Sequence, residues 1–222
     1  MKTVHRLASV VAAFVATMVC PHMVASQSYS YPSMQLPISS QRDFTVALVA
    51  SKRTAALLQW RQGVSDHTHF TLETGLGDPL GSSKNLLTFA AGNAGYQLFL
   101  ASDGPPLDVL LTMGIGISLG IEQKAVHVPV GVSIGRRFAT GGGTMFTPYV
   151  HPRVSFDRCT TCSRSEIKRE RSVNVDVGFN LEITPHVALI ASGAFNGSDR
   201  ALREDSFAIG IKWLQKPFGS RD

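Results

Sequence analysis

Alternation of apolar and polar residues is the feature of this sequence that most limits its possible folds. In several segments between residues 107 and 182, apolar side chains occupy every second position over long stretches. Successive side chains of a β-strand point to opposite faces, so a period of two predicts strands with one apolar and one polar face. The clearest runs are Leu107, Val109, Leu111, Met113, Ile115, Ile117 and Leu119; Val126, Val128, Val130, Val132 and Ile134; and Val173, Val175, Val177, Phe179 and Leu181.

The rest of the chain after residue 42 follows the same rhythm and predicts about ten antiparallel strands, or about eight because the first four are less regular. Connections after the third, seventh and ninth strands are longer than most of those between them, as expected of a barrel with short turns at one end. In the fourth strand, Gly92, Asn93 and Gly95 predict a bulge or a close backbone approach. The predicted strands are 43–51, 54–63, 67–77, 86–101, 106–120, 125–138, 144–158, 170–183, 185–196 and 204–214.

The first 26 residues have the composition of a secretory signal peptide. Lys2, His5 and Arg6 precede an apolar run over residues 7–19, which is too short to span a bilayer as a helix. Small residues near position 26 offer a cleavage site. We therefore expect a signal peptide over 1–26, a flexible or loosely packed leader over 27–42, one barrel domain over 43–214 and a tail over 215–222.

Alternation alone does not say which face is outside, because a soluble β-sandwich also has one apolar face. The predicted strands are long compared with the usual 5–6 residues, and a tilted transmembrane strand needs about 9–11. Their polar face is rich in Gly, Ser, Ala, Thr and Asn, which suits a crowded barrel interior. Both features favour strands whose apolar face meets lipid.

The last predicted strand carries Phe207, Ile209, Ile211 and Trp213 on one face, with small residues and Lys212 on the other. With the signal peptide, this makes the chain from 43 to 214 resemble small bacterial outer-membrane β-barrel proteins of the porin-like kind. Members of that class typically finish on the aromatic residue, whereas here residues 215–222 follow Trp213. The resemblance implies an all-β, closed, antiparallel up-and-down transmembrane barrel in the bacterial outer membrane. Its implied partners are outer-membrane lipid, lipopolysaccharide and the barrel assembly machinery.

For such a barrel we expect a structural, narrow passive-diffusion or surface-interaction role, and no enzymatic activity. A secreted soluble β-sandwich or ligand-binding barrel is the alternative, and a membrane-embedded hydrolase is a second one. The net charge of +5 includes two cations of the predicted signal peptide, and no basic stripe interleaved with aromatics appears, so we expect no nucleic-acid partner. No cofactor or metal is expected.

Charged and histidine side chains lie on the predicted inner face, where each needs a partner. We interpret them as a lumen network of ion pairs and hydrogen bonds, with a solute path as the alternative. No catalytic residue is expected, because His151 and Ser155 stand about 13 Å apart along one strand, beyond hydrogen-bond reach. The network candidates are Arg61, Glu73, Asp108, His127, His151, Arg153, Asp176, Glu182 and Lys212.

Cys159 and Cys162 lie in the long connection after the seventh predicted strand. A disulfide is our first interpretation, ahead of a redox pair, a zinc site or free thiols. The same region is basic, which predicts either contact with lipopolysaccharide phosphates or another anionic partner, or simply a well-solvated loop. Its cations are Arg158, Arg164, Lys168, Arg169 and Arg171.

Overall fold

The computed structural model describes residues 33–38, 42–51, 53–79, 87–120, 123–160, 168–196 and 205–215. Nearly all of this part of the chain is β-strand, with a single short 3₁₀ helix, η1 (Ala101–Asp103). No helix among these residues is long and apolar enough to cross a membrane. The strands are β1 (Arg42–Ala50), β2 (Arg53–Gly63), β3 (Thr68–Pro79), β4 (Leu87–Phe99), β5 (Asp108–Gly120), β6 (Gln123–Gly135), β7 (Phe138–Gly141), β8 (Thr144–Cys159), β9 (Lys168–Thr184), β10 (Val187–Asn196) and β11 (Ser206–Gln215).

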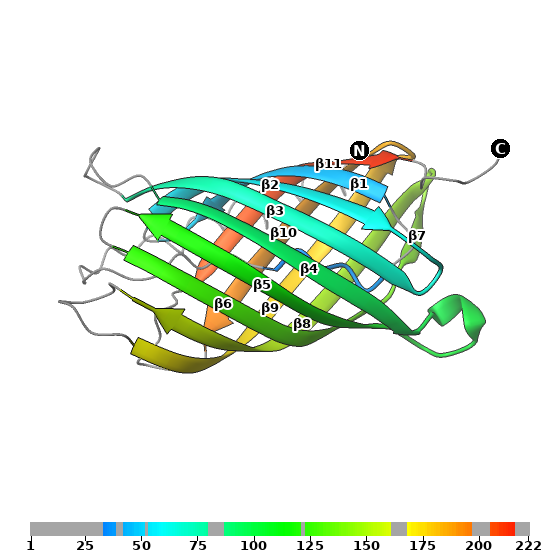
Figure 1. The fold of residues 1–222 in the computed structure, drawn as a ribbon. Helices are drawn as coiled ribbons and strands as arrows, with labels where there is room; N and C mark the ends of the chain where they lie inside the picture. Colours follow the sequence, from blue (N-terminus) through cyan, green and yellow to red (C-terminus); the bar gives the residue numbers. More distant parts are fainter. Residues whose placement is uncertain are drawn as a thin grey trace.

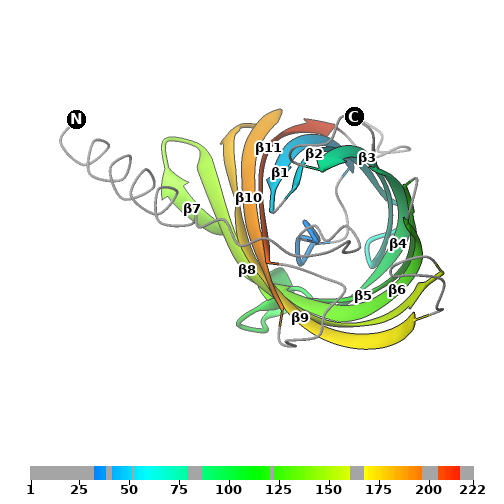
Figure 2. The ribbon, with the colours of Figure 1, turned by 90° about the vertical axis from the view of Figure 1, so that its left-hand side faces the viewer.

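Antiparallel pairing closes the sheet into a barrel (Figures 1 and 2). Except for β6 and β7, strands that are neighbours in the sequence pair with each other, and β1 pairs with β11. β8 pairs with the short β7 at its start and with β6 along most of its remaining length. The result is a closed barrel of 10 strands with one extra strand. Closure leaves every barrel strand paired on both sides, and in lipid only such a sheet satisfies its backbone groups. The predicted fold class is confirmed.

The predicted sixth strand, 125–138, was too long at its end, because residue 138 belongs to a separate strand, β7. The barrel strand β6 ends at Gly135, and β7 forms a separate hairpin with the start of β8. This hairpin projects from the barrel beside β8 and β10 (Figure 2). Gly142 and Gly143 in its turn have φ angles of 62° and 82°, which glycine adopts without steric cost. Continuous alternation in the sequence hid the break between the two strands.

The apolar face of the strands is the outer face. Met113 is 61% exposed and Ile115 is 58% exposed, although both lie in the middle of β5, and Leu48 on β1 is 61% exposed as well. A soluble sandwich or ligand-binding barrel buries such residues, so this surface contradicts that alternative. It fits a barrel surrounded by lipid chains.

Aromatic residues form a row near the end of the barrel at which β1 starts and β11 ends. Phe44 on β1 lies opposite Trp60 on β2 and Trp213 on β11. The rings of Phe44 and Trp213 have their centroids 6.3 Å apart. Aromatic girdles at the membrane interface have this arrangement, because the amphipathic rings favour the headgroup level.

Residues 33–38 differ from the flexible or loosely packed leader that we expected over 27–42. They lie inside the barrel, where Figure 2 shows them within the ring of strands. Met34, Gln35 and Leu36 are only 1%, 2% and 1% exposed. Six residues without alternation give no local signal for this placement, which depends on lumen groups from distant strands. The remainder of the predicted leader before β1 lies outside the described residues.

β4 shows the expected irregularity at a shifted position. Its register with β5 shifts between Gln97 and Phe99, after the glycines that had suggested a bulge. Gly95 instead marks a close approach, because a Cβ there would collide with the ring of His69.

Candidate functional site in the barrel lumen

The barrel interior gathers the polar side chains predicted to face inward. All nine candidates lie on the inner face, and each is at most 8% exposed. An open aqueous channel would leave inward side chains accessible to water, so these low exposures describe a filled interior. The nine residues are Arg61, Glu73, Asp108, His127, His151, Arg153, Asp176, Glu182 and Lys212.

Asp43 organises the first cluster. Its carboxylate accepts a hydrogen bond from Arg61 Nε at 2.8 Å and a second contact from the same guanidinium. The ammonium of Lys212, on the neighbouring β11, lies 3.7 Å from the same carboxylate oxygen. Because a buried cation without a counter-charge is costly, one aspartate neutralises a site that two cations approach.

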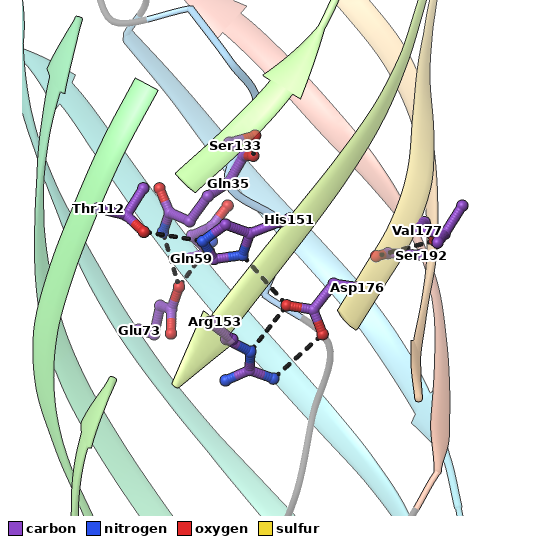
Figure 3. A network of polar contacts seen from close by, with 10 residues as sticks. All are labelled: Gln35, Gln59, Glu73, Thr112, Ser133, His151, Arg153, Asp176, Val177 and Ser192. Carbon is purple, nitrogen blue, oxygen red and sulfur yellow. Dashed lines mark hydrogen bonds and ion pairs between the residues drawn. The ribbon is translucent and has the colours of Figure 1, made fainter. Parts of the chain in front are cut away.

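Gln35 connects residues 33–38 to the wall (Figure 3). Its side-chain amide donates to Glu73 Oε1 at 3.3 Å, and its carbonyl oxygen lies 3.1 Å from His69 Nε2. An amide oxygen only accepts, so His69 carries its proton on Nε2 in this contact. Gln59 donates to the same Glu73 oxygen at 2.8 Å.

Backbone groups of the same segment are also bonded to the wall. Ser133 donates to the carbonyl of Gln35 at 2.6 Å, and Gln97 donates to the carbonyl of Pro37 at 2.7 Å. The Gln35 side chain and two backbone carbonyls of the segment are therefore bonded to the wall, which lowers the cost of burying a peptide.

Asp176 organises a second cluster in the centre of Figure 3. Arg153 approaches both carboxylate oxygens, with Nε at 2.8 Å and Nη2 at 3.1 Å. His151 Nδ1 lies 3.1 Å from Asp176, and its Nε2 lies 2.8 Å from the hydroxyl of Thr112. The bidentate arginine contact fixes the carboxylate, which in turn orients the imidazole.

A third cluster joins Ser118, His127 and Asp157 on β5, β6 and β8. His127 Nδ1 lies 2.8 Å from Asp157, and its Nε2 lies 3.3 Å from Ser118 Oγ. Ser155 and Ser172 donate to the two oxygens of Asp157 at 2.7 and 3.2 Å. This is the order of groups by which an imidazole activates a serine hydroxyl.

Two predicted candidates lie outside these clusters. Glu182 forms an ion pair with Arg137, just before β7. Asp108 accepts a hydrogen bond from the backbone nitrogen of Ala101 at 2.8 Å and so closes the connection between β4 and β5. Both residues stabilise the wall or a turn near the end of the barrel that carries the termini of the sheet.

The interior also has an apolar patch that the sequence analysis did not predict. It packs Met34 of residues 33–38, which we call the lumen segment, against Phe89 and aliphatic residues of the strands. The members are Met34, Ala47, Val49, Ala55, Leu57, Leu87, Phe89, Ile190 and Ala208. Met34 thus adds hydrophobic burial to the hydrogen bonds of Gln35.

Sequence reasoning missed the partners of the network rather than its charged members. Asp43 lay at the expected start of the first strand, and Asp157 was not among the predicted candidates. Ser118 shares the inward phase of Asp108 and Thr112, which was the available signal. Register between strands brings Ser118 to His127, and the sequence does not show register. Among the described residues, no group of three or more His, Cys, Asp or Glu side chains is placed to hold a metal ion.

The predicted basic loop is described only in part. Three of its arginines are exposed on the outer face, near the end of β8 and the start of β9: Arg158, Arg169 and Arg171. Arg164 and the side chain of Lys168 lie outside the described residues. Cys159 is disulfide-bonded, but Cys162 is not among the described residues, so the pairing of these two cysteines stays a prediction.

Comparisons with known proteins identify the architecture. No protein-family model matches the sequence, and a search of curated proteins gives no match. Among solved structures, the beta domain of the Bordetella autotransporter BrkA has a TM-score of 0.56 and 12% identity, over 79% of this chain and 100% of that one. LpxR from Salmonella typhimurium has a TM-score of 0.44 and 12% identity, over 85% and 79% of the two chains. For the KdgM porin the values are 0.40 and 6%, over 77% and 98%.

The fold is that of the small bacterial outer-membrane β-barrels, as the sequence resemblance implied. At these identities the likeness concerns the fold. In this chain, three polar clusters and residues 33–38 occupy the space inside the wall.

Proposed function

We propose that the chain spans the bacterial outer membrane as a structural and surface-interaction barrel whose lumen is closed to free diffusion of solutes. The observation that carries this proposal is the burial of residues 33–38 inside the barrel. Barrels of about eight strands have interiors just wide enough for side chains, and a barrel only slightly wider is blocked by one extended peptide. Export through a cleaved signal peptide over 1–26 is part of the proposal.

The orientation follows the usual rule for these barrels, with short turns and both termini in the periplasm. β1 starts and β11 ends at the same end of the barrel, and the hairpins β2–β3 and β9–β10 turn there within a few residues. The opposite end, where β8 and β9 extend furthest, then faces the cell exterior.

Conductance in planar bilayers tests the closed lumen. We expect the full mature chain to show no stable single-channel steps, and a variant without residues 27–38 to show larger currents. The variant proves that the assay detects an opened lumen. Stable steps from the full mature chain would contradict the closed lumen and favour a narrow passive-diffusion role.

A second candidate function, ester hydrolysis at the outer mouth, is favoured by the Ser118–His127–Asp157 cluster. Asp157 fixes the imidazole so that Nε2 faces the hydroxyl, as a general base requires. A fluorophosphonate probe tests this candidate, because it labels activated serines. Labelling that is lost in Ser118→Ala and kept in Ser192→Ala supports a hydrolase. Absence of labelling in the wild-type protein counts against it and leaves the cluster a structural one.

A further inference from the structure

Three exposed arginines form a cationic group on the outer face, which we call the arginine rim. Arg158 on β8 lies directly opposite Arg169 on β9, and Arg171 lies opposite Phe156. The guanidinium carbon of Arg171 is 5.8 Å from the centre of the Phe156 ring. Along β9 toward the other end of the barrel, the same outward phase continues with exposed Val173.

Charge makes this arrangement unfavourable by itself. Cations directly opposite each other on one face of an antiparallel pair repel and destabilise the pairing. An anion between Arg158 and Arg169 removes this repulsion. Guanidinium groups bind both carboxylate and phosphate oxygens in a bidentate manner, and a phosphate monoester carries more charge than a carboxylate, so phosphate neutralises two arginines better.

The position of the rim specifies where the phosphate comes from. The arginines stand at the end of the lipid-facing apolar band, and the ring of Phe156 lies beneath Arg171 at the level where aromatic residues meet headgroups. In the proposed orientation this is the outer leaflet. Arg158 also lies opposite apolar Val126 on β6, so the rim borders lipid on this side as well.

We propose that Arg158, Arg169 and Arg171 form a binding site for the phosphate groups of lipopolysaccharide in the outer leaflet. This inference rests on the outer-membrane orientation of the proposed function and names the partner of its surface-interaction role. The site is on the wall, so it acts without any path through the lumen.

Binding of lipopolysaccharide to the detergent-solubilised mature protein tests the inference by native mass spectrometry or fluorescence titration. Each cation near an anionic lipid surface contributes enough attraction for about a fivefold change in affinity. We therefore expect Arg171→Gln to weaken binding about fivefold, and the triple variant Arg158→Gln/Arg169→Gln/Arg171→Gln to weaken it by about a hundredfold. Higher salt should weaken binding of the wild-type protein more than binding of the triple variant.

The chain offers a matched control in Arg136. This arginine is exposed and lies 5.8 Å from the ring centre of Phe138, the same geometry as Arg171, but at the opposite end of the barrel. We expect Arg136→Gln to bind like the wild-type protein, and dephosphorylated lipopolysaccharide to bind the wild-type protein weakly. Heat-dependent gel mobility confirms that each variant is folded.

Three outcomes would overturn the inference: unchanged binding by the triple variant, an equal loss in Arg136→Gln, or equal binding of dephosphorylated lipopolysaccharide. Failure of the closed-lumen proposal is read separately, because conductance measures the interior and this titration measures the outer wall. A barrel that conducts ions and still binds through the three arginines would contradict only the proposed lumen.

Discussion

Single charged residues in the lumen stabilise the barrel by neutralising the buried charges beside them. Asp176 receives Arg153 at 2.8 and 3.1 Å and His151 at 3.1 Å, and it is 0% exposed. A buried carboxylate with such contacts is stabilised by the opposite charge of its partners, and the buried charges of the partners are stabilised by the carboxylate. Removing one member therefore costs more than the pair contributes.

Asp176→Asn tests this dependence. We expect it to lower the free energy of unfolding by about 3–5 kcal/mol, because Arg153 keeps its charge and loses the carboxylate. The double variant Arg153→Met/Asp176→Asn should lose less, since no charge is then left behind. Urea unfolding in lipid vesicles measures both values, and a double variant less stable than the single one would contradict the argument.

For residues on the outer face, the cost of introducing a charge depends on how deep the residue lies in the membrane. Val130 is 40% exposed near the middle of β6, whereas Leu119, 47% exposed, lies next to the end of β5. Val130→Arg should cost about 2–4 kcal/mol near the bilayer midplane, and Leu119→Arg about 0–1 kcal/mol near the interface. The same vesicle unfolding assay compares them. Equal costs at the two positions would argue against a lipid-facing wall.

Whole elements differ in how well local sequence describes them. Strands of the barrel are visible as alternation, because each carries one face toward lipid and one toward the lumen. Residues 33–38 show no such period, since their conformation depends on Gln97, Ser133 and Glu73, which are distant in the sequence. A buried peptide without alternating apolar and polar residues can be placed only once the surrounding barrel is known.

The partner of Cys159 in its disulfide bond can be tested by mass spectrometry. Cys159 is disulfide-bonded, and Cys20 belongs to the predicted signal peptide, so we expect Cys162 as its partner in the mature chain. Reduction should then raise the mass of the intact mature protein by two hydrogens, and a non-reduced digest should contain one peptide pair linked through these cysteines. An unchanged mass on reduction would show free thiols.

At the scale of the whole molecule, closure decides stability. β1 and β11 pair along the full length of β1, from Arg42 opposite Gln215 to Ala50 opposite Phe207, so the sheet has no open edge at its chain ends. A closed sheet opens only by breaking a complete strand pair, which makes unfolding strongly cooperative.

Gel mobility tests closure directly. We expect the membrane-extracted protein to stay folded in detergent at room temperature and to change its mobility after boiling. The membrane pellet should retain the protein through urea washing. A soluble protein without a mobility change would contradict the transmembrane barrel.

Alternation in the sequence was enough to predict most strands and their two faces, because it is a local property that each strand needs wherever it pairs. The same alternation placed the nine polar candidates on the inner face, where all nine are buried. The sequence also indicated the membrane-facing role of the apolar face through strand length and the small residues opposite. The break between β6 and β7 and the position of the bulge in β4 escaped it, since neither interrupts alternation at the expected place.

The contacts between inner residues could not be predicted from the sequence. His151 meets Thr112 and Asp176, and His127 meets Ser118 and Asp157, through contacts between strands rather than along one. Register and closure set these contacts, and both arise from pairing between segments far apart in the chain. For the same reason the lumen segment and the opposed arginines Arg158 and Arg169 became visible only in the folded barrel.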